Sequence, residues 1–563
     1  MKRASPPDGA SACPRDGPRR RTGQASFAAG AGWPPGGCEG HAGHAPDRRR
    51  WLLTVAGSAL ASCALPGPAD EAPADAPALR REFRAAWVAS VAHIDWPSRA
   101  GLGTVEQRQE MHQLLDAATR IGLNAIVLQV RPACDALYDS PFEPWSEYLS
   151  GHSGRAPDPW WDPLAEWVAA SHARGLELHA WFNPYRARHP SARSDLAASH
   201  VARREPGLVK AYGDLLWLDP GQPRAADRLV DVVLDVVRRY DVDGIHIDDY
   251  FYPYPVSVAG VEQAFPDEDS LAAYRAAGGA LEHDAWRRDN VDRLVHRLWQ
   301  AIRAERPGVM FGISPFGLPR PDRRPAGVSG FSQYHKLHAD VERWLAEGWL
   351  DYLAPQLYWP LDSPGQPFVP LLQAWLALNP RARHVWPGLF TSRIGAAERA
   401  YTADEVLAQV AAARRVPPGS GHLHFSMAAL LQDRDGVAGR LAAGPYAQPA
   451  LVPRAPGVTD AGGPTVSARV TGPTAGAQAL VLRSLATPPT HADRLRLVAL
   501  RRRRGQEWTT TLHPLSAAGG RVEVRLEPEV DLLLINALDR QRRLGPTTLI
   551  RRGDAGWSRA PAG

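Results

Sequence analysis

The chain has 563 residues, of which 44% are hydrophobic and 22% are charged, so it is long enough for two folded domains and too apolar to be disordered throughout. Its net charge is +5, and its basic residues form no long stripe interleaved with aromatic residues, which argues against a nucleic-acid surface. The run Arg501–Arg504 is better explained as the solvated end of a hairpin.

The N-terminal part of the chain predicts a leader followed by an export signal. Residues 1–47 are rich in Gly, Pro, Arg and Ala without periodicity, which indicates a disordered leader or a gene start assigned too early. Residues 48–63 run from arginines through a short apolar segment to Leu-Ala-Ser-Cys, which is the order of an export signal and too short to span a membrane. This ending resembles a bacterial lipobox, so we expect a lipoprotein signal with Cys63 lipidated. An ordinary signal peptide with a chance cysteine is the alternative.

A lipidated Cys63 would anchor the mature chain to a membrane. We therefore expect an exported lipoprotein of the bacterial cell envelope, on the periplasmic side and at the outer membrane. Residues 64–80 are rich in Pro, Ala and Asp and predict a tether. Because Cys13 and Cys38 fall in the leader, Cys134 is left alone, and neither a disulfide framework nor a metal cluster is expected.

From residue 81 to residue 447, short apolar runs alternate with helical patterns. The predicted strands begin near residues 83, 125, 177, 244, 309, 352, 384 and 421, and the predicted helices cover 104–121, 162–174, 224–239, 287–305, 339–348, 369–378 and 402–414. Strands that alternate with helices pair in parallel, and this number of units predicts a closed (β/α)8 barrel, the TIM barrel of the α/β class. A doubly wound open sheet is the alternative, but no glycine-rich phosphate turn follows the first strand.

After residue 450 the pattern changes to short strands separated by Pro and Gly. Alternating runs between residues 465 and 536 predict a small all-β sandwich of the immunoglobulin or fibronectin type over 455–552. It carries no residues that we would assign to catalysis. Packing against the barrel, or binding glycan, is its expected role.

The segment Asp243–Pro253 carries the strongest catalytic signal in the chain. It is typical of a barrel strand that ends in two adjacent acids, Asp248 and Asp249, before an aromatic loop. Alternation along the strand places Asp248 on the same face as His246, so Asp248 should point into the barrel mouth, whereas Asp249 can do so only if the strand has already ended. Adjacent carboxyls repel unless one keeps its proton, and such a pair suits general acid catalysis. A helix cap or a salt bridge is the structural alternative.

Polar and aromatic residues are expected around the same end of the barrel, because strand ends carry function in this fold. They are Arg131, His179, Asn183, Tyr185, Arg186, His246, Tyr250, Ser314, Gln356, Tyr358 and Trp359. Hydrogen-bonding groups mixed with flat apolar faces suit a sugar, so we expect them to bind substrate, although His179 could equally be an interior histidine. Neither a His spacing for a metal near the acids nor a Gly-x-Ser-x-Gly elbow after a strand occurs, so no metal, cofactor or serine nucleophile is expected.

Several motifs follow one another in order along residues 80–445. They are Arg84–Ser90 with Asp95–Pro97, Asn124–Pro132, Ala180–Arg186, Trp217–Pro220, Asp243–Pro253, Trp286–Asn290, Gly312–Gly317 and Pro355–Trp359. Together they resemble the glycosyl hydrolase-like family 10. The resemblance implies a TIM-barrel glycoside hydrolase, commonly a lipoprotein, that acts on cell-wall glycan stripped of its peptides. It therefore implies an exported glycosidase that cleaves the N-acetylglucosamine/N-acetylmuramic acid backbone of that glycan.

The later strand ends offer no second acid. Two-carboxylate glycosidases place their acids roughly 5 to 9.5 Å apart, usually on different strands, so a partner would come from a loop, with Asp95, Asp362 and Glu143 as candidates. Alternatively, one aspartate of the pair protonates the leaving oxygen while the other orients the acetamide group of the substrate as the nucleophile. A glycan-binding envelope lipoprotein without activity, and a hydrolase or deacetylase of another exopolysaccharide, are the competing functions.

Overall fold

The computed structural model describes residues 73–396, 400–418, 420–473, 477–484, 494–515, 520–554 and 556–559. The predicted leader, export signal, Cys63 and most of the predicted tether lie outside these ranges. Among the residues described, no helix is both long enough and apolar enough to cross a membrane.

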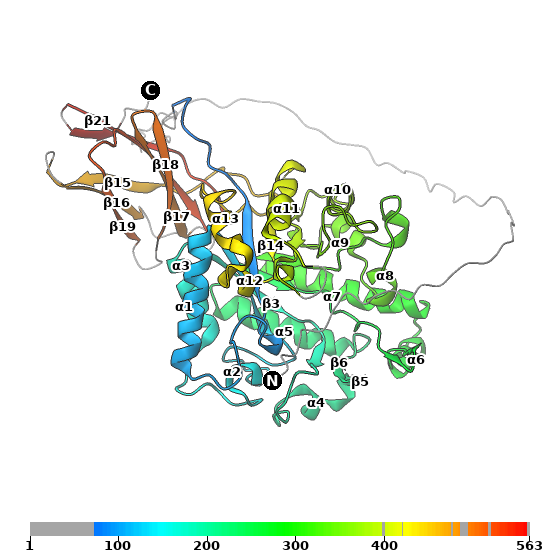
Figure 1. The fold of residues 1–563 in the computed structure, drawn as a ribbon. Helices are drawn as coiled ribbons and strands as arrows, with labels where there is room; N and C mark the ends of the chain where they lie inside the picture. The colour runs from blue at the N-terminus through cyan, green and yellow to red at the C-terminus, as the bar shows by residue number, and fades with distance from the viewer. Residues whose placement is uncertain are drawn as a thin grey trace, which may run out of the picture. The chain divides into compact units, whose positions relative to one another are not determined.

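A parallel sheet forms the centre of the barrel region (Figure 1). Its strands, in spatial order, are β12 (His384–Val385), β11 (Tyr352–Leu353), β10 (Met310–Ile313), β7 (Gly244–Ile247), β3 (Glu177–Phe182), β2 (Ala125–Arg131), β1 (Phe83–Val88), β14 (Gly421–His424) and β13 (Gly388–Leu389). Every pairing in this sheet is parallel. The alternation of strands and helices in the sequence correctly predicts this pairing.

The two ends of this strand order belong to one extended run. Only Trp386 and Pro387 separate β12 from β13, and β12 pairs with β11 while β13 pairs with β14. The Trp386 amide donates a hydrogen bond of 2.8 Å to the Leu353 carbonyl, and the Leu423 amide donates one of 3.1 Å to the Pro387 carbonyl. Because the run is bonded on both sides, the nine pieces form a closed ring of eight strands.

Helices follow the strands and surround them (Figure 1). They are α1 (Thr104–Ile121), α3 (Pro163–Ala173), α5 (Pro223–Arg239), α7 (His283–Glu305), α9 (Val341–Glu347), α10 (Phe368–Ala377) and α11 (Ala403–Arg415), with α12 (Met427–Leu431) and α13 (Val437–Ala443) after β14. Local signals set their ends. The Asp162 side chain accepts from the Ala165 amide at the start of α3, and α1 stops at Gly122, whose φ of 92° is favourable only for glycine.

Alternate residues of each strand enter two different cores. In β1, Ala86 and Val88 belong to the large cluster between strands and helices, whereas Phe83 and Trp87 belong to a smaller cluster that also contains Tyr352. Since successive strand side chains point to opposite faces, the smaller cluster fills the inside of the barrel. Polar residues on that inner face are therefore held inside the barrel.

Further short elements lie in the loops and were not predicted from the sequence. They are β4 (Arg186–Arg188), β6 (Leu215–Leu218) and β5 (Val209–Tyr212) in one antiparallel sheet, the hairpin β8 (Ser257–Val258) and β9 (Val261–Glu262), and the helices α2 (Glu147–Ser150), α4 (Val201–Arg204), α6 (Glu268–Ala276) and α8 (Gln333–Lys336). The small sheet follows β3 and the hairpin follows β7. Both thus extend loops at the carboxyl ends of strands, where this fold carries function.

The last part of the chain forms two antiparallel sheets. One has the order β15 (Val466–Thr471), β16 (Gln478–Ser484), β19 (Arg521–Leu526), and the other β18 (Glu507–Pro514), β17 (Leu495–Arg504), β20 (Leu532–Asp539), β21 (Thr548–Gly553), β22 (Gly556–Arg559). Leu480 from the first sheet shares a hydrophobic cluster with Leu500 and Leu533 from the second. This β-domain has the shared core that a sandwich needs. An immunoglobulin or fibronectin type stays a prediction.

Candidate active site

The two adjacent acids lie directly after β7, which ends at Ile247. Asp248 and Asp249 are each only 3% exposed. Because the strand has ended, their side chains are no longer forced to opposite faces, and each one reaches polar partners on other barrel strands or their loops. Alternation along the strand allowed Asp249 to point into the barrel mouth only if the strand ended before it. The strand does end before it, at Ile247.

Asp248 is held by donors from the neighbouring strand β3. The Trp181 indole N–H donates to Oδ2 over 3.0 Å, and the Asn183 amide nitrogen lies 3.1 Å from the same oxygen and 3.2 Å from Oδ1. Burial raises the pKa of the Asp248 carboxyl to about 7; the Arg186 charge opposes this rise and the Asp249 charge adds to it. Asp248 can therefore hold a proton close to neutral pH.

Asp249 has a different set of partners. The Tyr254 hydroxyl donates to its Oδ2 over 2.5 Å. Burial raises the pKa of Asp249 to about 6, against hydrogen bonds from Tyr254 and Gln356 that favour the ionised form. The pair therefore has a window, between about pH 6 and 7, in which Asp248 is mainly protonated and Asp249 mainly ionised.

Arg186 supplies the positive charge next to the pair. It begins β4, its Nε donates to the Pro132 carbonyl over 3.0 Å, and its guanidinium carbon lies 4.9 Å from the centre of the Tyr250 ring. The ring and the carbonyl fix the guanidinium in place. Two of the predicted substrate-binding residues, Arg186 and Tyr250, are thus brought to the acids.

His246 lies one inward-facing position before Asp248 on β7. Its Nε2 lies 2.9 Å from the Ser314 hydroxyl and 3.2 Å from the Trp87 indole nitrogen. Burial holds the pKa of His246 well below its usual range, so the ring is neutral. The ring belongs to the floor beneath the acids and has no exposed face for a substrate.

Partly exposed aromatic rings surround the acids. Tyr254 stacks on Phe331 at 5.2 Å between ring centres, and Tyr358 stacks on Phe390 at 4.7 Å. Burial and the charge of Asp249 raise the pKa of Tyr358, which indicates that its phenol lies near the pair. Apolar faces next to carboxyls are what a sugar ring requires.

The three candidates for a second carboxylate have different surroundings. Asp95 accepts from the Ser426 hydroxyl and the Ala428 amide, each over 2.7 Å, and so ties the loop after β1 to the start of α12. Glu143 forms a buried bidentate pair with Arg131, both bonds 2.7 Å long, and Arg131 keeps the pKa of Glu143 low although burial alone would raise it. Asp362 is exposed on the loop after β11. Only Asp362 is therefore not committed to a buried contact.

Some residues predicted to bind substrate are buried elsewhere. Arg131 pairs with Glu143 and is fully buried. Tyr185 lies in the core between strands and helices, where burial, and then the charge of Asp219, raises its pKa. His179 lies inside the barrel with Glu177 as a partner. Arg131, Tyr185 and His179 therefore do not lie at the barrel mouth, where a substrate-binding residue would be expected.

Cys134, which the sequence leaves without a cysteine partner, is a buried free thiol. It is fully buried, its sulfur accepts a hydrogen bond of 3.1 Å from Arg131, and burial raises its pKa to about 11. A thiol that stays protonated is a poor nucleophile. Cys134 is therefore part of the packing around Arg131.

Three residues of the site were missed in the sequence. Trp181 lies between His179 and Asn183 in the alternation of β3, so the period of the strand could have identified it as inward-facing. Trp87 carried the same signal, since it alternates with Ala86 and Val88 on β1. Tyr254 carried none, because a loop brings it to Asp249.

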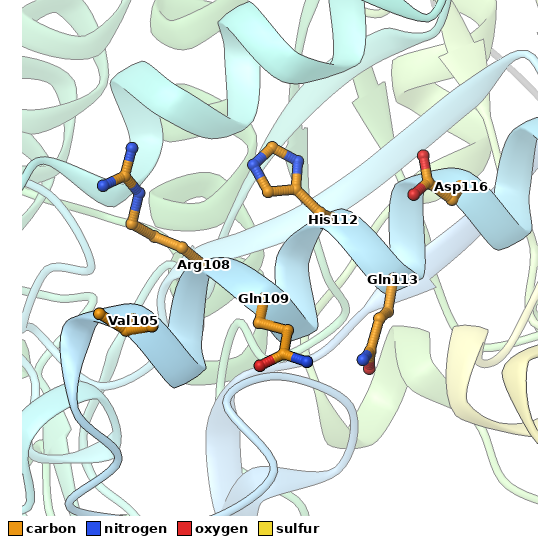
Figure 2. A pocket seen from close by; sticks show the side chains of 6 residues that line it. All are labelled: Val105, Arg108, Gln109, His112, Gln113 and Asp116. Carbon is orange, nitrogen blue, oxygen red and sulfur yellow. The ribbon is translucent and has the colours of Figure 1, made fainter.

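A hollow on the outside of the barrel does not belong to this site. Figure 2 shows it along α1, lined by Val105, Arg108, Gln109, His112, Gln113 and Asp116. Arg108 is bound to Glu166 of α3, and Asp116 is bound to Arg174 at the end of α3. These are surface ion pairs between neighbouring helices.

Comparisons with known proteins give several matches. Residues 82–404 match the family described as "Glycosyl hydrolase-like 10". Glycosyl hydrolase YngK of Bacillus subtilis is 41% identical over 384 residues, which cover 67% of this chain and 74% of that protein. Glycosyl hydrolase DigH of Escherichia coli K12 is 32% identical over 379 residues, which cover 62% of this chain and 84% of that protein. The glycoside hydrolase domain of PgaB from Bordetella bronchiseptica aligns with 65% of this chain and 98% of that domain, at 13% identity and a TM-score of 0.44.

Proposed function

Because the chain belongs to the glycosyl hydrolase-like 10 family, we propose that it cleaves O-glycosidic bonds in a polysaccharide with Asp248 and Asp249 as its catalytic residues. The observation that carries this proposal is the pair itself. Two adjacent carboxyls at the end of a barrel strand have raised pKa values of about 7 and about 6, so one can give a proton while the other is charged.

The geometry supports Asp248 as the general acid. Its proton goes to the glycosidic oxygen as the bond from that oxygen to the anomeric carbon breaks. On an N-acetyl sugar, the acetamide oxygen forms a new bond to the same carbon, and ionised Asp249 stabilises the positive charge on the acetamide N–H. Tyr254 keeps Asp249 oriented for this task through its 2.5 Å hydrogen bond.

The second half of the reaction restores both groups. Asp248, now ionised, takes a proton from a water molecule, and the water oxygen attacks the anomeric carbon. The bond to the acetamide oxygen breaks, and its electron pair returns to that oxygen. Substrate-assisted hydrolysis of this kind needs no second carboxylate on another strand.

A two-carboxylate mechanism is the alternative, and Asp362 is its best partner. Asp95 and Glu143 are engaged in the contacts described above, so Asp362 alone would be free to approach a substrate. Asp362→Asn separates the two mechanisms. It should lower turnover by less than about 10-fold in the substrate-assisted mechanism and abolish it in the other.

We propose the N-acetylglucosamine/N-acetylmuramic acid backbone of peptidoglycan, freed of its peptides, as the substrate. The partly exposed rings of Tyr254 and Tyr358 support a sugar polymer, because they offer flat faces beside the acids. Trp359 is also partly exposed and packs edge-on against Phe316. The acetamide groups of this glycan supply the internal nucleophile. A lipid anchor on Cys63 would hold the enzyme close to it, and the β-domain would serve as an accessory module.

Product analysis on purified polymers tests the proposal. Peptide-free cell-wall glycan incubated with the chain should yield shortened oligosaccharides by mass spectrometry, and Asp248→Asn should lower the rate about 100- to 10,000-fold. Asp227→Asn on the surface of α5, where Asp227 pairs with Arg297, is the matched control and should leave the rate unchanged.

The same experiment separates the competing functions. Binding of the glycan without shortening would make the chain an anchor and refute hydrolysis. Loss of acetyl groups with intact chain length would indicate a deacetylase. Shortening only of another polymer, such as poly-N-acetylglucosamine, would keep the hydrolase and refute the proposed substrate.

A further inference from the structure

A row of buried polar side chains runs along the inside of the barrel. Glu177 Oε2 lies 3.1 Å from His179 Nε2, and His179 Nδ1 lies 2.9 Å from the Tyr352 hydroxyl. The same hydroxyl lies 3.0 Å from His246 Nδ1, whose Nε2 reaches Ser314 over 2.9 Å. None of these side chains is more than 3% exposed. We call this row the axial chain.

The axial chain starts at the opposite end of the barrel from the acids. Glu177 is the first residue of β3, and Ser314 directly follows the last residue of β10. His246 stands two residues before Asp248 on β7, and Trp181, which donates to Asp248, packs edge-on against the His246 ring at 6.3 Å. The axial chain therefore ends directly beneath the catalytic pair.

The donors and acceptors fix a direction along this row. An ionised Glu177 can only accept, so the His179 Nε2 carries a hydrogen and its Nδ1 accepts from the Tyr352 hydroxyl. The Tyr352 oxygen in turn accepts from the Nδ1–H of His246. His246 Nε2 is then an acceptor, which matches its contacts with the Trp87 indole N–H and the Ser314 hydroxyl. Every group is satisfied in this one arrangement.

Two arginines of the β-domain set the charge at the start of the row. Arg542 donates to both oxygens of Glu177 over 2.8 and 2.7 Å, and Arg496 pairs with Oε1 of the same carboxylate. All three side chains are buried. A carboxylate out of water remains ionised only when charges of this kind compensate it. Among the described residues of the barrel, no arginine or lysine forms an ion pair with Glu177 in place of these two.

Loss of these arginines would reverse the row. A protonated Glu177 would donate to His179, which would donate through its Nδ1 to Tyr352, and Tyr352 would donate to His246. His246 would then carry its hydrogen on Nε2, where it meets the N–H of Trp87. Two N–H groups cannot form a hydrogen bond with each other, so His246, Trp87 and Ser314 beneath the acids would have to rearrange.

We propose that Arg542 and Arg496 are positioning residues for the proposed hydrolysis: by holding Glu177 ionised, they set the direction of the axial chain and so place His246 and Ser314 beneath Asp248. The β-domain is thus required by the barrel for turnover. This role rests on the proposed function, and it goes beyond packing or glycan binding.

Kinetics of four full-length variants test the role. Arg542→Met should lower kcat about 10- to 100-fold and change KM less than about twofold. The reason is that Asp248 and Asp249 would be misplaced, whereas the aromatic rings proposed to bind the substrate would keep their positions. Tyr352→Phe breaks the row without changing any charge and should have a similar effect. Arg503→Met is the matched control: Arg503 lies in the same domain, pairs with Asp531, and should leave kcat unchanged.

The double variant Glu177→Gln with Arg542→Met separates positioning from stability. A glutamine carbonyl can accept from His179 without needing a charge partner, so the double variant should recover at least about tenfold of the kcat lost in the single one. If Arg542→Met lowers only the thermal midpoint and leaves kcat intact, or if the double variant recovers nothing, the arginines are structural and the proposal is wrong.

Histidine NMR decides the question without turnover. In protein labelled with ¹⁵N-histidine, His179 should carry its hydrogen on Nε2 and His246 on Nδ1, and Arg542→Met should move both to the other nitrogen. Tyr352→Phe should affect His246 and His179 locally and so assign the signals. Unchanged tautomers in Arg542→Met would overturn the proposal, whereas a wild-type chain that cleaves no glycan would refute only the function.

Discussion

The ionisation of Asp248 and Asp249 determines both the activity and the stability that we expect of this chain. Each carboxyl is only 3% exposed, and the charge of Asp249 adds to the cost of ionising Asp248. Apparent pKa values measured for such a pair belong to the pair as a whole. Removing the Asp248 carboxyl should lower activity but raise stability in alkaline solution, and the two effects can be measured separately.

Hydrolysis should follow a bell-shaped pH profile. Activity is lost below about pH 6, where Asp249 takes up a proton, and above about pH 7, where Asp248 loses its proton. The maximum is expected between these values. Measuring kcat/KM against pH on a soluble glycan tests this expectation, and a profile that stays flat from pH 5 to 9 would contradict the assigned roles.

Removing the charge of Asp248 should stabilise the folded chain in alkaline solution. The pKa of Asp248 is raised from 3.8 to about 7 on folding, so its contribution to stability is present below about pH 4 and is lost as the pH rises to about 7. Asp248→Asn cannot ionise and avoids this loss. Its free energy of unfolding should exceed that of the wild type by on the order of 4 kcal/mol at pH 8 and by little at pH 4.

Denaturant titrations of the two proteins at both pH values provide the measurement. An advantage of the variant that is equal at pH 4 and pH 8 would mean that the carboxyl is not the cause. A variant less stable than the wild type at pH 8 would show that the charged form is favoured by the fold.

Among single residues, the sequence predicted those whose role follows from strand alternation. Asp248 and His246 were assigned to the inner face correctly, because a period of two needs only the strand itself. The pairing of Arg131 with Glu143 was not predicted, because Glu143 lies in a loop that the sequence does not position. The inward direction of Trp87 follows from the alternation of β1, but its contact with His246 on β7 cannot be predicted from the pattern of either strand.

At the level of elements, the loop that follows β7 controls the second acid. Tyr254 lies on this loop and donates to Asp249, which favours the ionised form. Tyr254→Phe removes that hydrogen bond, so the pKa of Asp249 should rise above about 6 and the acid limb of the pH profile should move to higher pH. The alkaline limb, which reports Asp248, should move less.

Profiles of kcat/KM against pH for wild type and variant give the comparison. Tyr274→Phe is a matched control, since the Tyr274 hydroxyl accepts from the Leu281 amide after α6 and contacts neither acid. An acid limb that stays in place, or moves to lower pH, would show that Tyr254 does not act on Asp249.

The order of strands and helices was predictable, whereas the loops were not. Helix α1 was predicted over the residues it occupies, since its apolar period and the stop at Gly122 are both local signals. The sheet of β4, β5 and β6 was missed because its strands are only three or four residues long. Strands of this length contain too few residues for an alternating pattern to be recognised in a single sequence.

At the level of the whole molecule, we expect Cys63 to determine where the chain resides. Cys63→Ser removes the thiol to which a lipid would be attached, so the protein should move from the membrane fraction to the soluble fraction and lose labelling by radioactive palmitate. Cys38→Ser, upstream of the expected cleavage site, should change neither. Membrane association that survives Cys63→Ser would mean that another segment provides the anchor.

The ring of strands also determines when the protein can fold. β1 pairs with β14, and the ion pair between Glu82 and Arg414 next to this junction joins residues that are 332 positions apart. Contacts at such separation form slowly, because a long loop must close first. During synthesis the barrel cannot close until the last strand has left the ribosome. Under the export that we propose, late closure would keep the barrel open during most of synthesis, in a state that can pass through a narrow membrane pore.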